Sequence, residues 1–272
     1  MRPLVEVGVL AANRIIQAIG GPVAEPLATI VARPFLQTTH RGERAALRSG
    51  LRWQIDLANN LERRLYFVRS YERATVQEAK RRLRPGDVVL DVGANIGTFA
   101  LPLARAGATV VAVEPASDTA NRLREHVNMN DLTNRVHVIQ AALGKERSQV
   151  DLRLGSKIDT GLRTLTGAGR VIEKVEAIPG DQLLQSLGLT ANIVKVDVEG
   201  GELMVFRGMP KTLATARHVF VEVVPSHQAR GGESIAALIE HLQGFGFIPW
   251  HIRNRGLEAW KGQPGNAFFT RQ

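Results

Sequence analysis

A glycine-containing segment directly after an apolar stretch constrains the fold most. Val88–Val92 is β-branched and apolar apart from Asp91, as in a strand buried on both faces of a parallel sheet. The next residues include Gly93 and Gly97 and lead into a predicted helix at Thr98–Ala106. Glycines permit a tight turn and close backbone approach, and a helix N-terminus offers unpaired N–H groups. The segment therefore predicts a ligand site at the carboxyl end of a parallel strand.

Strand and helix patterns alternate along most of the remaining chain. The predicted strands are 88–92, 108–113, 136–142, 193–197 and 219–224, and the predicted helices are 75–83, 98–106, 118–128, 181–187, 202–214 and 234–243. A β-rich insertion is expected at 149–178, and a terminal hairpin from strands 247–252 and 267–270. This order predicts an α/β fold with a doubly wound, mostly parallel sheet, helices on both faces and a terminal antiparallel β-hairpin.

The chain divides by charge. Residues 1–84 carry 15 Lys/Arg against 7 Asp/Glu, whereas residues 85–272 carry 20 against 19. We expect an N-terminal helical extension at 1–50 and a main domain at 51–272, which consists of a lead-in at 51–84, strand-like over 51–68 with a polar turn at Asn59-Asn60, and the core at 85–272. A solvated, arginine-rich cap is the favoured interpretation of the basic region; contact with an anionic membrane surface, an acidic partner or nucleic acid stays open.

The composition excludes several classes of site. With no cysteine, the chain forms neither disulfides nor thiolate metal sites, and it has no cysteine nucleophile. Residues 4–18 are too short and polar to cross a bilayer and lack a signal-peptide cleavage pattern. We therefore expect a cytoplasmic protein, peripheral to a membrane at most. No feature of the sequence specifies an oligomeric state.

Two carboxylates accompany the glycine segment. Asp91 precedes it and is placed to engage a cationic amino group or a water, and Glu114 ends the second strand, where it can accept both ribose hydroxyls of an adenosine. A pyrophosphate would be repelled by Asp91, and the Gly93-x-x-x-Gly97 spacing differs from the dinucleotide pattern. These features predict the sulfonium nucleoside S-adenosyl-L-methionine. The structural alternatives are a turn-capping Asp91 and a surface Glu114.

A second strand–turn–helix unit follows at Ile193–Glu202. Strand periodicity puts Lys195, Asp197 and Glu199 on one side. A buried lysine needs a carboxylate, so Lys195 is equally well a structural ion-pair partner. For Glu202, in the first turn of the next helix, a capping role is favoured.

The motifs together resemble the FkbM-type methyltransferase family over about residues 51 to 270. The matching segments are Tyr71-Glu72, Pro85-Gly86-Asp87, Asp91–Gly97, Lys195–Glu202 and Val219–Val223. One departure is Pro179-Gly180-Asp181, where the family usually has Thr-Leu-Asp. The resemblance implies a seven-stranded class I methyltransferase fold, S-adenosyl-L-methionine as donor, and O-methylation of sugar or polyketide hydroxyls.

Candidate site residues follow from these motifs. The cofactor-binding candidates are Glu72, Asp91, Gly93, Ala94, Asn95, Gly97, Glu114, Ala141 and Asp197, and the catalytic candidates are Asp197, His227 and Glu199. Glu72 would close over the methionine end of the donor or serve as a helix N-terminal carboxylate. His227 follows the fifth strand and has the chemistry of a general base, against the alternative of a surface loop histidine. No metal is predicted, although Asp197, Glu199 and Glu222 together could hold Mg²⁺.

Three functions are compared. The favoured one is an O-methyltransferase acting on a hydroxyl of a small molecule: a sugar, glycolipid or polyketide. An RNA methyltransferase gripping its substrate through residues 1–84 is the alternative, disfavoured because the arginines there are not interleaved with stacking aromatics. A non-catalytic donor-binding module is the third, and the intact Asp91, Glu114 and Asp197 argue against it.

Overall fold

The computed structural model describes residues 43–46, 50–56, 59, 61–62, 65–66, 72–154, 163–165, 169–232, 234–253 and 256–271. The chain forms two compact units. The first comprises Met1–Tyr71 with Ser156–Leu162, and the second comprises Glu72–Gly155 with Arg163–Gln272. The helices expected before residue 43, Tyr71, and part of the loop expected around Thr160 lie outside the described residues. The domain boundary at residue 50 stays a prediction.

In the first unit, the antiparallel strands β1 (Glu43–Ala46) and β2 (Arg52–Ile55) form a pair. Residues 61–62 and 65–66 are helical, so the strand-like pattern predicted for 51–68 is wrong at these four residues. Leu61 and Leu65 are four residues apart, which is helical spacing. Asn59 supports this turn, because its Oδ1 accepts a hydrogen bond from the backbone N–H of Glu62 at 3.3 Å.

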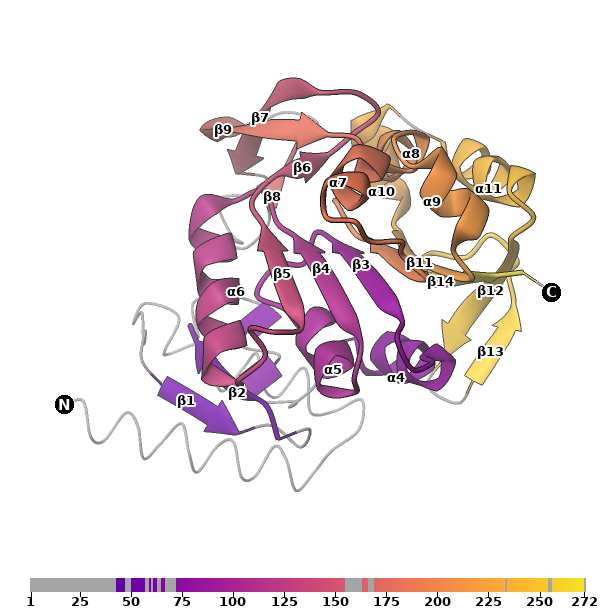
Figure 1. Cartoon of the computed structure of the whole chain (residues 1–272). Helices are drawn as coiled ribbons and strands as arrows, with labels where there is room; N and C mark the ends of the chain where they lie inside the picture. The colour runs from indigo at the N-terminus through magenta and orange to yellow at the C-terminus, as the bar shows by residue number, and fades with distance from the viewer. Residues whose placement is uncertain are drawn as a thin grey trace, which may run out of the picture. The chain divides into compact units, whose positions relative to one another are not determined.

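The second unit is built on one large sheet (Figure 1), which confirms the predicted α/β fold. Its strand order is β13-β12-β14-β11-β10-β3-β4-β5. The parallel strands are β3 (Val88–Val92), β4 (Thr109–Val113), β5 (Val136–Ile139), β10 (Ile193–Val196) and β11 (His218–Val223). The strand order reverses between β3 and β10, so the carboxyl ends of these neighbours form the expected ligand-binding edge.

Antiparallel strands complete the sheet at its C-terminal side. They are β12 (Ile248–Arg253), β13 (Gly256–Ala259) and β14 (Gly265–Thr270), and β14 lies between β11 and β12. The sheet therefore has eight strands where seven were predicted. The additional strand, β13, is a short edge strand with two exposed residues, and such a strand has a weak hydrophobic pattern.

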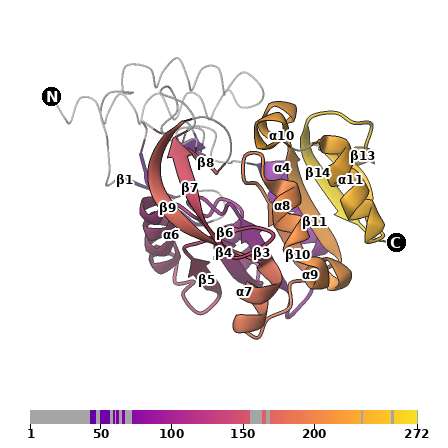
Figure 2. The same cartoon turned by 90° about the horizontal axis from the view of Figure 1, so that it is seen from above.

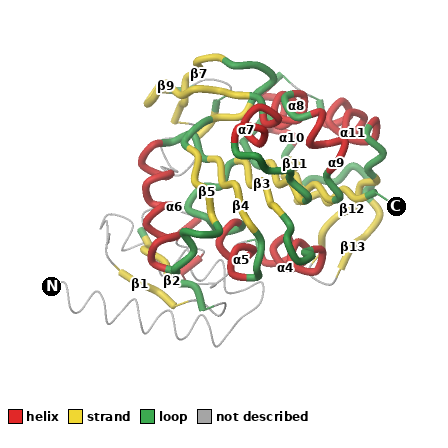
Figure 3. The backbone as a smooth tube through the Cα atoms, viewed as in Figure 1, coloured by secondary structure: helices red, strands yellow, loops and turns green. Residues whose placement is uncertain are grey.

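Helices cover both faces of this sheet (Figures 2 and 3). Near the start of the unit are α4 (Arg73–Arg82), α5 (Ala100–Arg105) and α6 (Ser117–Met129). The later helices are α7 (Gly180–Ser186), α8 (Glu202–Arg207), α9 (Pro210–Thr215), α10 (Pro225–Gly231) and α11 (Ile235–Gly244). Apolar residues of α7, α8, α9 and α11 join those of β3, β10 and β11 in the main core. In the described part of the chain, no helix has the length and apolar character to cross a membrane.

Two predicted elements are divided in the structure. The helix expected at 202–214 breaks into α8 and α9, because Pro210 lacks an N–H and begins the second helix. The strand expected at 136–142 also divides: β5 joins the large sheet, whereas β6 (Ala142–Leu143) joins a smaller one. The smaller sheet, in order β6-β9-β7-β8, contains β7 (Ser148–Leu154), β8 (Arg163–Thr164) and β9 (Arg170–Ile178), and it confirms the predicted β-rich insertion.

Candidate active site

Strand register brings the acidic residues of two motifs together. Lys195 of β10 is aligned with Asp91 of β3. Asp197 follows Lys195 by two positions, and Glu222 stands at the same level in β11, since Val196 is aligned with the residue before Glu222. Alternate residues of a strand share a face. The site therefore combines residues more than 100 positions apart at one edge of the sheet.

Lys195 is the centre of a buried charge group that we call the Lys195 network: Lys195, Glu72, Asp91 and Asp197. Its Nζ lies 3.0 Å from Asp197 Oδ2, 3.7 Å from Glu72 Oε2 and 4.0 Å from Asp91 Oδ1. Burial alone would lower the pKa of Lys195, but the three carboxylates raise it well above its ordinary value. The lysine is therefore charged and is shared among three acids. The structural ion-pair interpretation of Lys195 is confirmed, whereas its place in a functional site stays a prediction.

The acids of this network exceed the charge that one lysine can balance. Burial raises the pKa of Asp91 to about 6 and that of Glu72 to about 7, with Lys195 opposing and Asp197 adding to both shifts. The backbone of Ala100 lowers the pKa of Asp91, but no side chain among the described residues forms a hydrogen bond with either carboxylate oxygen of Asp91. The carboxyl end of β3 is therefore an environment that favours an additional positive charge.

The glycine loop is held against this network by its own backbone. The N–H groups of Gly93 and Ala94 both donate to the carbonyl of Val113, at 2.9 and 3.0 Å. Gly93 has a φ of +80°, and a Cβ there would lie 1.8 Å from the carbonyl oxygen of Asp197. Glycine is thus required for the loop to approach the turn at Asp197–Gly201, which we call the acidic turn. The sequence pattern alone did not distinguish this contact from a close approach of the loop to a ligand.

Glu114 is fixed by the same loop. Its two oxygens accept hydrogen bonds from the backbone N–H groups of Asn95, at 2.9 Å, and Ala116, at 3.0 Å. The residue is buried, so the alternative of a surface carboxylate is wrong. Each carboxylate oxygen can accept more than one hydrogen bond, and ribose hydroxyls remain compatible with this arrangement. Gly97, on the same loop, would place a Cβ 2.6 Å from Cδ1 of Leu123, and Ala141 is buried just after β5.

Two acids near the site are structural. Glu202 accepts hydrogen bonds from the backbone N–H groups of Gly200, at 3.1 Å, and Val198, at 3.4 Å, so it stabilises the turn before α8, whereas the helix-capping role predicted for it stays a prediction. Asp181, in the segment that departs from the family pattern, accepts from the N–H and hydroxyl of Thr212 and so caps α9. The segment Pro179-Gly180-Asp181 therefore differs from the Thr-Leu-Asp of the family but keeps the aspartate, which caps a helix.

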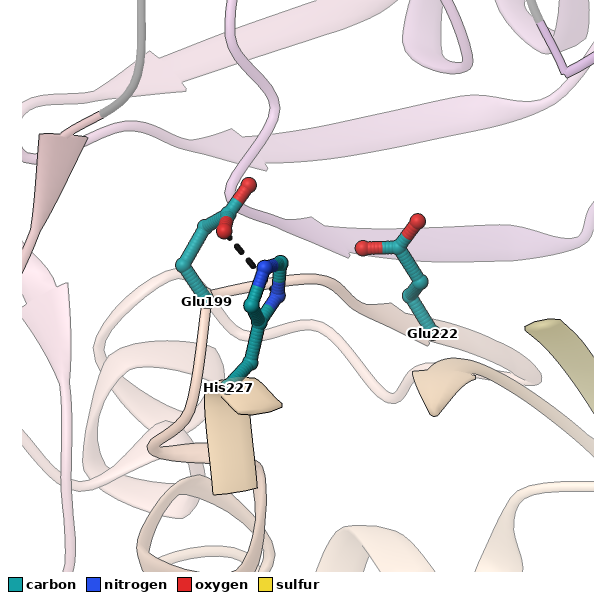
Figure 4. A group of neighbouring side chains, drawn as sticks. All are labelled: Glu199, Glu222 and His227. Carbon is teal, nitrogen blue, oxygen red and sulfur yellow. Dashed lines mark ion pairs between the residues drawn. The ribbon is translucent and has the colours of Figure 1, made fainter. Parts of the chain in front are cut away.

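A second group, which we call the rim cluster, consists of Glu199, Glu222 and His227 (Figure 4). His227 Nδ1 lies 3.0 Å from Glu199 Oε2, and one ligand-type atom from each of the three residues lies within 4.8 Å of the others. The figure shows the two carboxylates on opposite sides of the imidazole ring. Two of the three predicted catalytic residues are therefore in direct contact, and the third, Asp197, belongs to the neighbouring Lys195 network.

His227 is placed by a helix, and the loop predicted there is wrong. α10 begins at Pro225, and proline at the first helical position was the available sequence signal. A Cβ on Gly231 would lie 1.6 Å from the carbonyl oxygen of Gly200, so the end of α10 packs directly on the backbone of the acidic turn. This contact joins the element that carries His227 to the turn that carries Glu199.

Glu222 was considered only as a metal ligand and was not among the predicted catalytic residues. Burial, followed by the negative charges of Asp197, Glu72 and Glu199, raises its pKa to about 9. The sequence signal was an acid on the site-facing side of an otherwise apolar strand.

Comparison with known proteins places these features in one family. Residues 91–249 match the family described as the methyltransferase FkbM domain. The chain is 34% identical over 138 residues to hexuronic acid methyltransferase AglP of Haloferax volcanii, covering 50% of this chain and 56% of that protein. It is 29% identical over 225 residues to 31-O-demethyl-FK506 methyltransferase FkbM of Streptomyces tacrolimicus, covering 70% and 82%. A 29% match over 177 residues to 23S rRNA (uracil(1939)-C(5))-methyltransferase RlmD of Thiobacillus denitrificans covers 64% of this chain and 32% of that protein.

Proposed function

Because this chain belongs to the FkbM methyltransferase family, we propose that it transfers a methyl group from S-adenosyl-L-methionine to a hydroxyl oxygen of a small molecule. A sugar, a glycolipid or a polyketide is the proposed acceptor class. The observation that carries this proposal is the placement of the Lys195 network beside the rim cluster at the ends of β3, β10 and β11. One group suits a cationic donor, and the other suits removal of a proton. The names of AglP and FkbM support a small-molecule acceptor.

The residues at the end of β3 fit the proposed donor. The buried Asp91 carboxylate, which has no side-chain hydrogen-bond partner among the described residues, fits a ligand with ammonium and sulfonium charges. Glu114 is oriented to accept hydrogen bonds from ribose hydroxyls, and Gly93 to Gly97 form the loop between these two acids. When bound, S-adenosyl-L-methionine supplies the electrophilic methyl group, and its sulfur leaves as a neutral thioether.

His227 is the proposed general base. The Glu199 carboxylate lies 3.0 Å from His227 Nδ1 and favours a proton on that nitrogen, which leaves Nε2 as the proposed proton acceptor. The acceptor O–H bond breaks as its proton passes to Nε2, and the oxygen forms its bond to the methyl carbon as the carbon–sulfur bond breaks. A general base contributes about 10²–10⁴-fold to such a reaction. Asp197, between the two groups, is proposed to line the pocket and orient the reacting oxygen.

The charge of the site bears on the RNA alternative. Asp197 and Glu199 lie near one another beside Glu222, and a polyanion brought there meets their like charge in a partly buried environment. A neutral hydroxyl compound meets no such repulsion. The match to the rRNA enzyme covers about a third of that protein. RNA methylation therefore remains the second candidate, supported by that match and opposed by the acidic rim.

The test has a binding step and a transfer step. Calorimetry should detect binding of S-adenosyl-L-methionine, whereas NAD and ATP serve as controls that should not bind. The methyl-labelled donor is then incubated with neutral glycosides, glycolipids, macrolides, uronic acids and ribosomal RNA, and the products are analysed by mass spectrometry. We expect an O-methyl product from a neutral acceptor. Label found only in RNA would favour the alternative, and absence of donor binding would refute both.

A further inference from the structure

Glu222 is an acid of the rim cluster to which the proposed mechanism gives no role. It lies at the end of β11 beside Asp197, and its carboxylate is within 4.8 Å of ligand-type atoms of Glu199 and His227. Within the described part of the chain, the Glu222 carboxylate forms neither a hydrogen bond nor an ion pair with another residue. A polar group in this position is available to a bound molecule.

The surroundings of Glu222 favour its neutral form. Its neighbours include the acids Asp197 and Glu199. The cation that opposes them, Lys195, is already in contact with the other acids of its network. Like charges this close do not all ionise in a partly buried site, and the proton remains on the acid with the weakest compensation. A protonated carboxyl is a hydrogen-bond donor.

We propose that Glu222 binds the acceptor as a neutral carboxylic acid and donates a hydrogen bond to the same hydroxyl oxygen whose proton His227 removes. Two hydrogen bonds of about 2.8 Å span up to about 5.6 Å, and one ring nitrogen of His227 lies within 4.8 Å of a carboxylate oxygen of Glu222, so the imidazole and the carboxyl group are close enough to contact one bound oxygen. A hydroxyl is suited to this arrangement because it can donate to His227 and accept from Glu222 simultaneously.

This role has consequences for both rate and selectivity. The hydrogen bond from Glu222 strengthens as negative charge develops on the oxygen, which lowers the barrier to proton removal. A carboxylate or phosphate in the same place would bring a full negative charge beside Asp197 and Glu199, so the subsite selects neutral hydroxyl compounds. The inference rests on the proposed function and specifies the acceptor chemistry of the same site.

The experiment compares Glu222→Gln with Glu222→Leu. The amide of glutamine keeps an uncharged hydrogen-bond donor, whereas leucine removes it. We expect kcat for methyl transfer to stay within about tenfold of wild type for Glu222→Gln and to fall about 10²–10³-fold for Glu222→Leu. Donor affinity, measured by calorimetry, should not change in either variant. Glu258→Gln, an exposed residue of β13, is the matched surface control.

The pH profile provides a readout that a structural role would not change. Wild-type kcat should fall as the pH rises through about 9, because Glu222 ionises and its hydrogen-bond donor is lost. The charged or titratable groups facing it are Lys195, Asp197, Glu199, Glu72 and His227, and Glu222→Gln leaves all of them in place. The variant should therefore lack this high-pH loss. If Glu222→Leu does not fold, the activity and pH profile of Glu222→Gln still test whether Glu222 acts as a neutral hydrogen-bond donor.

Three results would overturn the inference. Full activity of a folded Glu222→Leu would show that Glu222 has no part in transfer. Equal damage from Gln and Leu, with activity abolished by a chelator and restored by Mn²⁺, would make Glu222 a metal ligand. A high-pH loss that persists in Glu222→Gln would assign the titration to another group. Failure of the proposed function is distinct, because folded wild-type protein would then transfer no methyl group to any hydroxyl.

Discussion

The Lys195 network and the rim cluster are adjacent, yet they balance charge in different ways. In the network, three carboxylates surround one buried lysine whose side chain is 5% exposed. In the rim cluster, the only group that can become positive is His227, and the side chains of His227 and Glu199 are 18% and 24% exposed. The charge of the proposed donor side, which is the Lys195 network, is therefore fixed by ion pairs within the fold. The charge of the proposed acceptor side, which is the rim cluster, depends on which of its groups are protonated. Variants in each group should separate folding and donor binding from proton transfer.

Gly93→Ala should have the largest effect, because it breaks the contact between the glycine loop and the acidic turn. The new Cβ would lie 1.8 Å from the Asp197 carbonyl oxygen at a φ of +80°. We expect a loss of at least about 3 kcal/mol in the free energy of unfolding and no measurable donor binding. Gly86→Ala is the matched control, since its φ is +82° with open space around it. Equal losses in both variants, measured by urea unfolding, would show that φ strain and not the contact is responsible.

Lys195→Met should destabilise the donor side without any steric clash. It leaves Glu72, Asp91 and Asp197 without their shared cation, and breaking a buried ion pair in this way costs about 3–5 kcal/mol. The loss should be smaller at pH 5 than at pH 8, because protonation of Glu72 and Asp91 relieves the repulsion. Urea unfolding at the two pH values measures this difference. A loss that is independent of pH would contradict the electrostatic explanation.

His227→Ala should affect chemistry alone. Methyl transfer should slow by about 10²–10⁴-fold, because the general base is absent, and S-adenosyl-L-methionine should bind with unchanged affinity. Glu199→Gln keeps the imidazole and loses only the charge that orients it, so its effect should be smaller. Single-turnover rates and calorimetry on both variants make the comparison. Weakened donor binding in His227→Ala would place the residue in the donor site.

Local sequence signals were sufficient for the donor side. β3, the glycine loop and β10 have short, strong patterns, because a buried parallel strand is a continuous apolar run and its turn needs glycine. The place of Glu202 in the first turn of α8 likewise follows from the sequence. In these places a few neighbouring residues were enough to predict the secondary structure.

The acceptor side depends on contacts between distant segments, which no local pattern shows. α10 is stabilised by the packing of Gly231 on Gly200, and the pKa of Glu222 is raised by burial and by acids on two other segments. The edge strand β13 is defined by pairing with β12 more than by its own residues. The shifted pKa of Glu222 and the pairing of the edge strand both depend on tertiary contacts, so they follow from the three-dimensional structure and not from a local sequence pattern.

The smallest expected effect is a decline in the stability of the ligand-free protein between pH 7 and 9. The folded pKa of Glu222, about 9, lies above its unfolded value of about 4.5, so the native state holds a proton that the unfolded state has released. Stability therefore falls as the pH rises towards 9. Below pH 6.5, His218 acts in the opposite direction, because burial lowers its pKa to about 4. One proton over these two pH units corresponds to about 2.7 kcal/mol, so scanning calorimetry should show the midpoint falling by about 5–10 °C.

Glu222→Gln should flatten this decline, whereas the surface variant Glu258→Gln should leave it unchanged. The glutamine cannot ionise, so the folded and unfolded states no longer differ in protons bound at this position. The same substitution leaves the Lys195 network intact, and any slope that remains near pH 7 then reports on Glu72, whose pKa is about 7. A wild-type midpoint that rises steadily to pH 9 would mean that the rim acids are already ionised and compensated, and the contrast between the two groups would be lost.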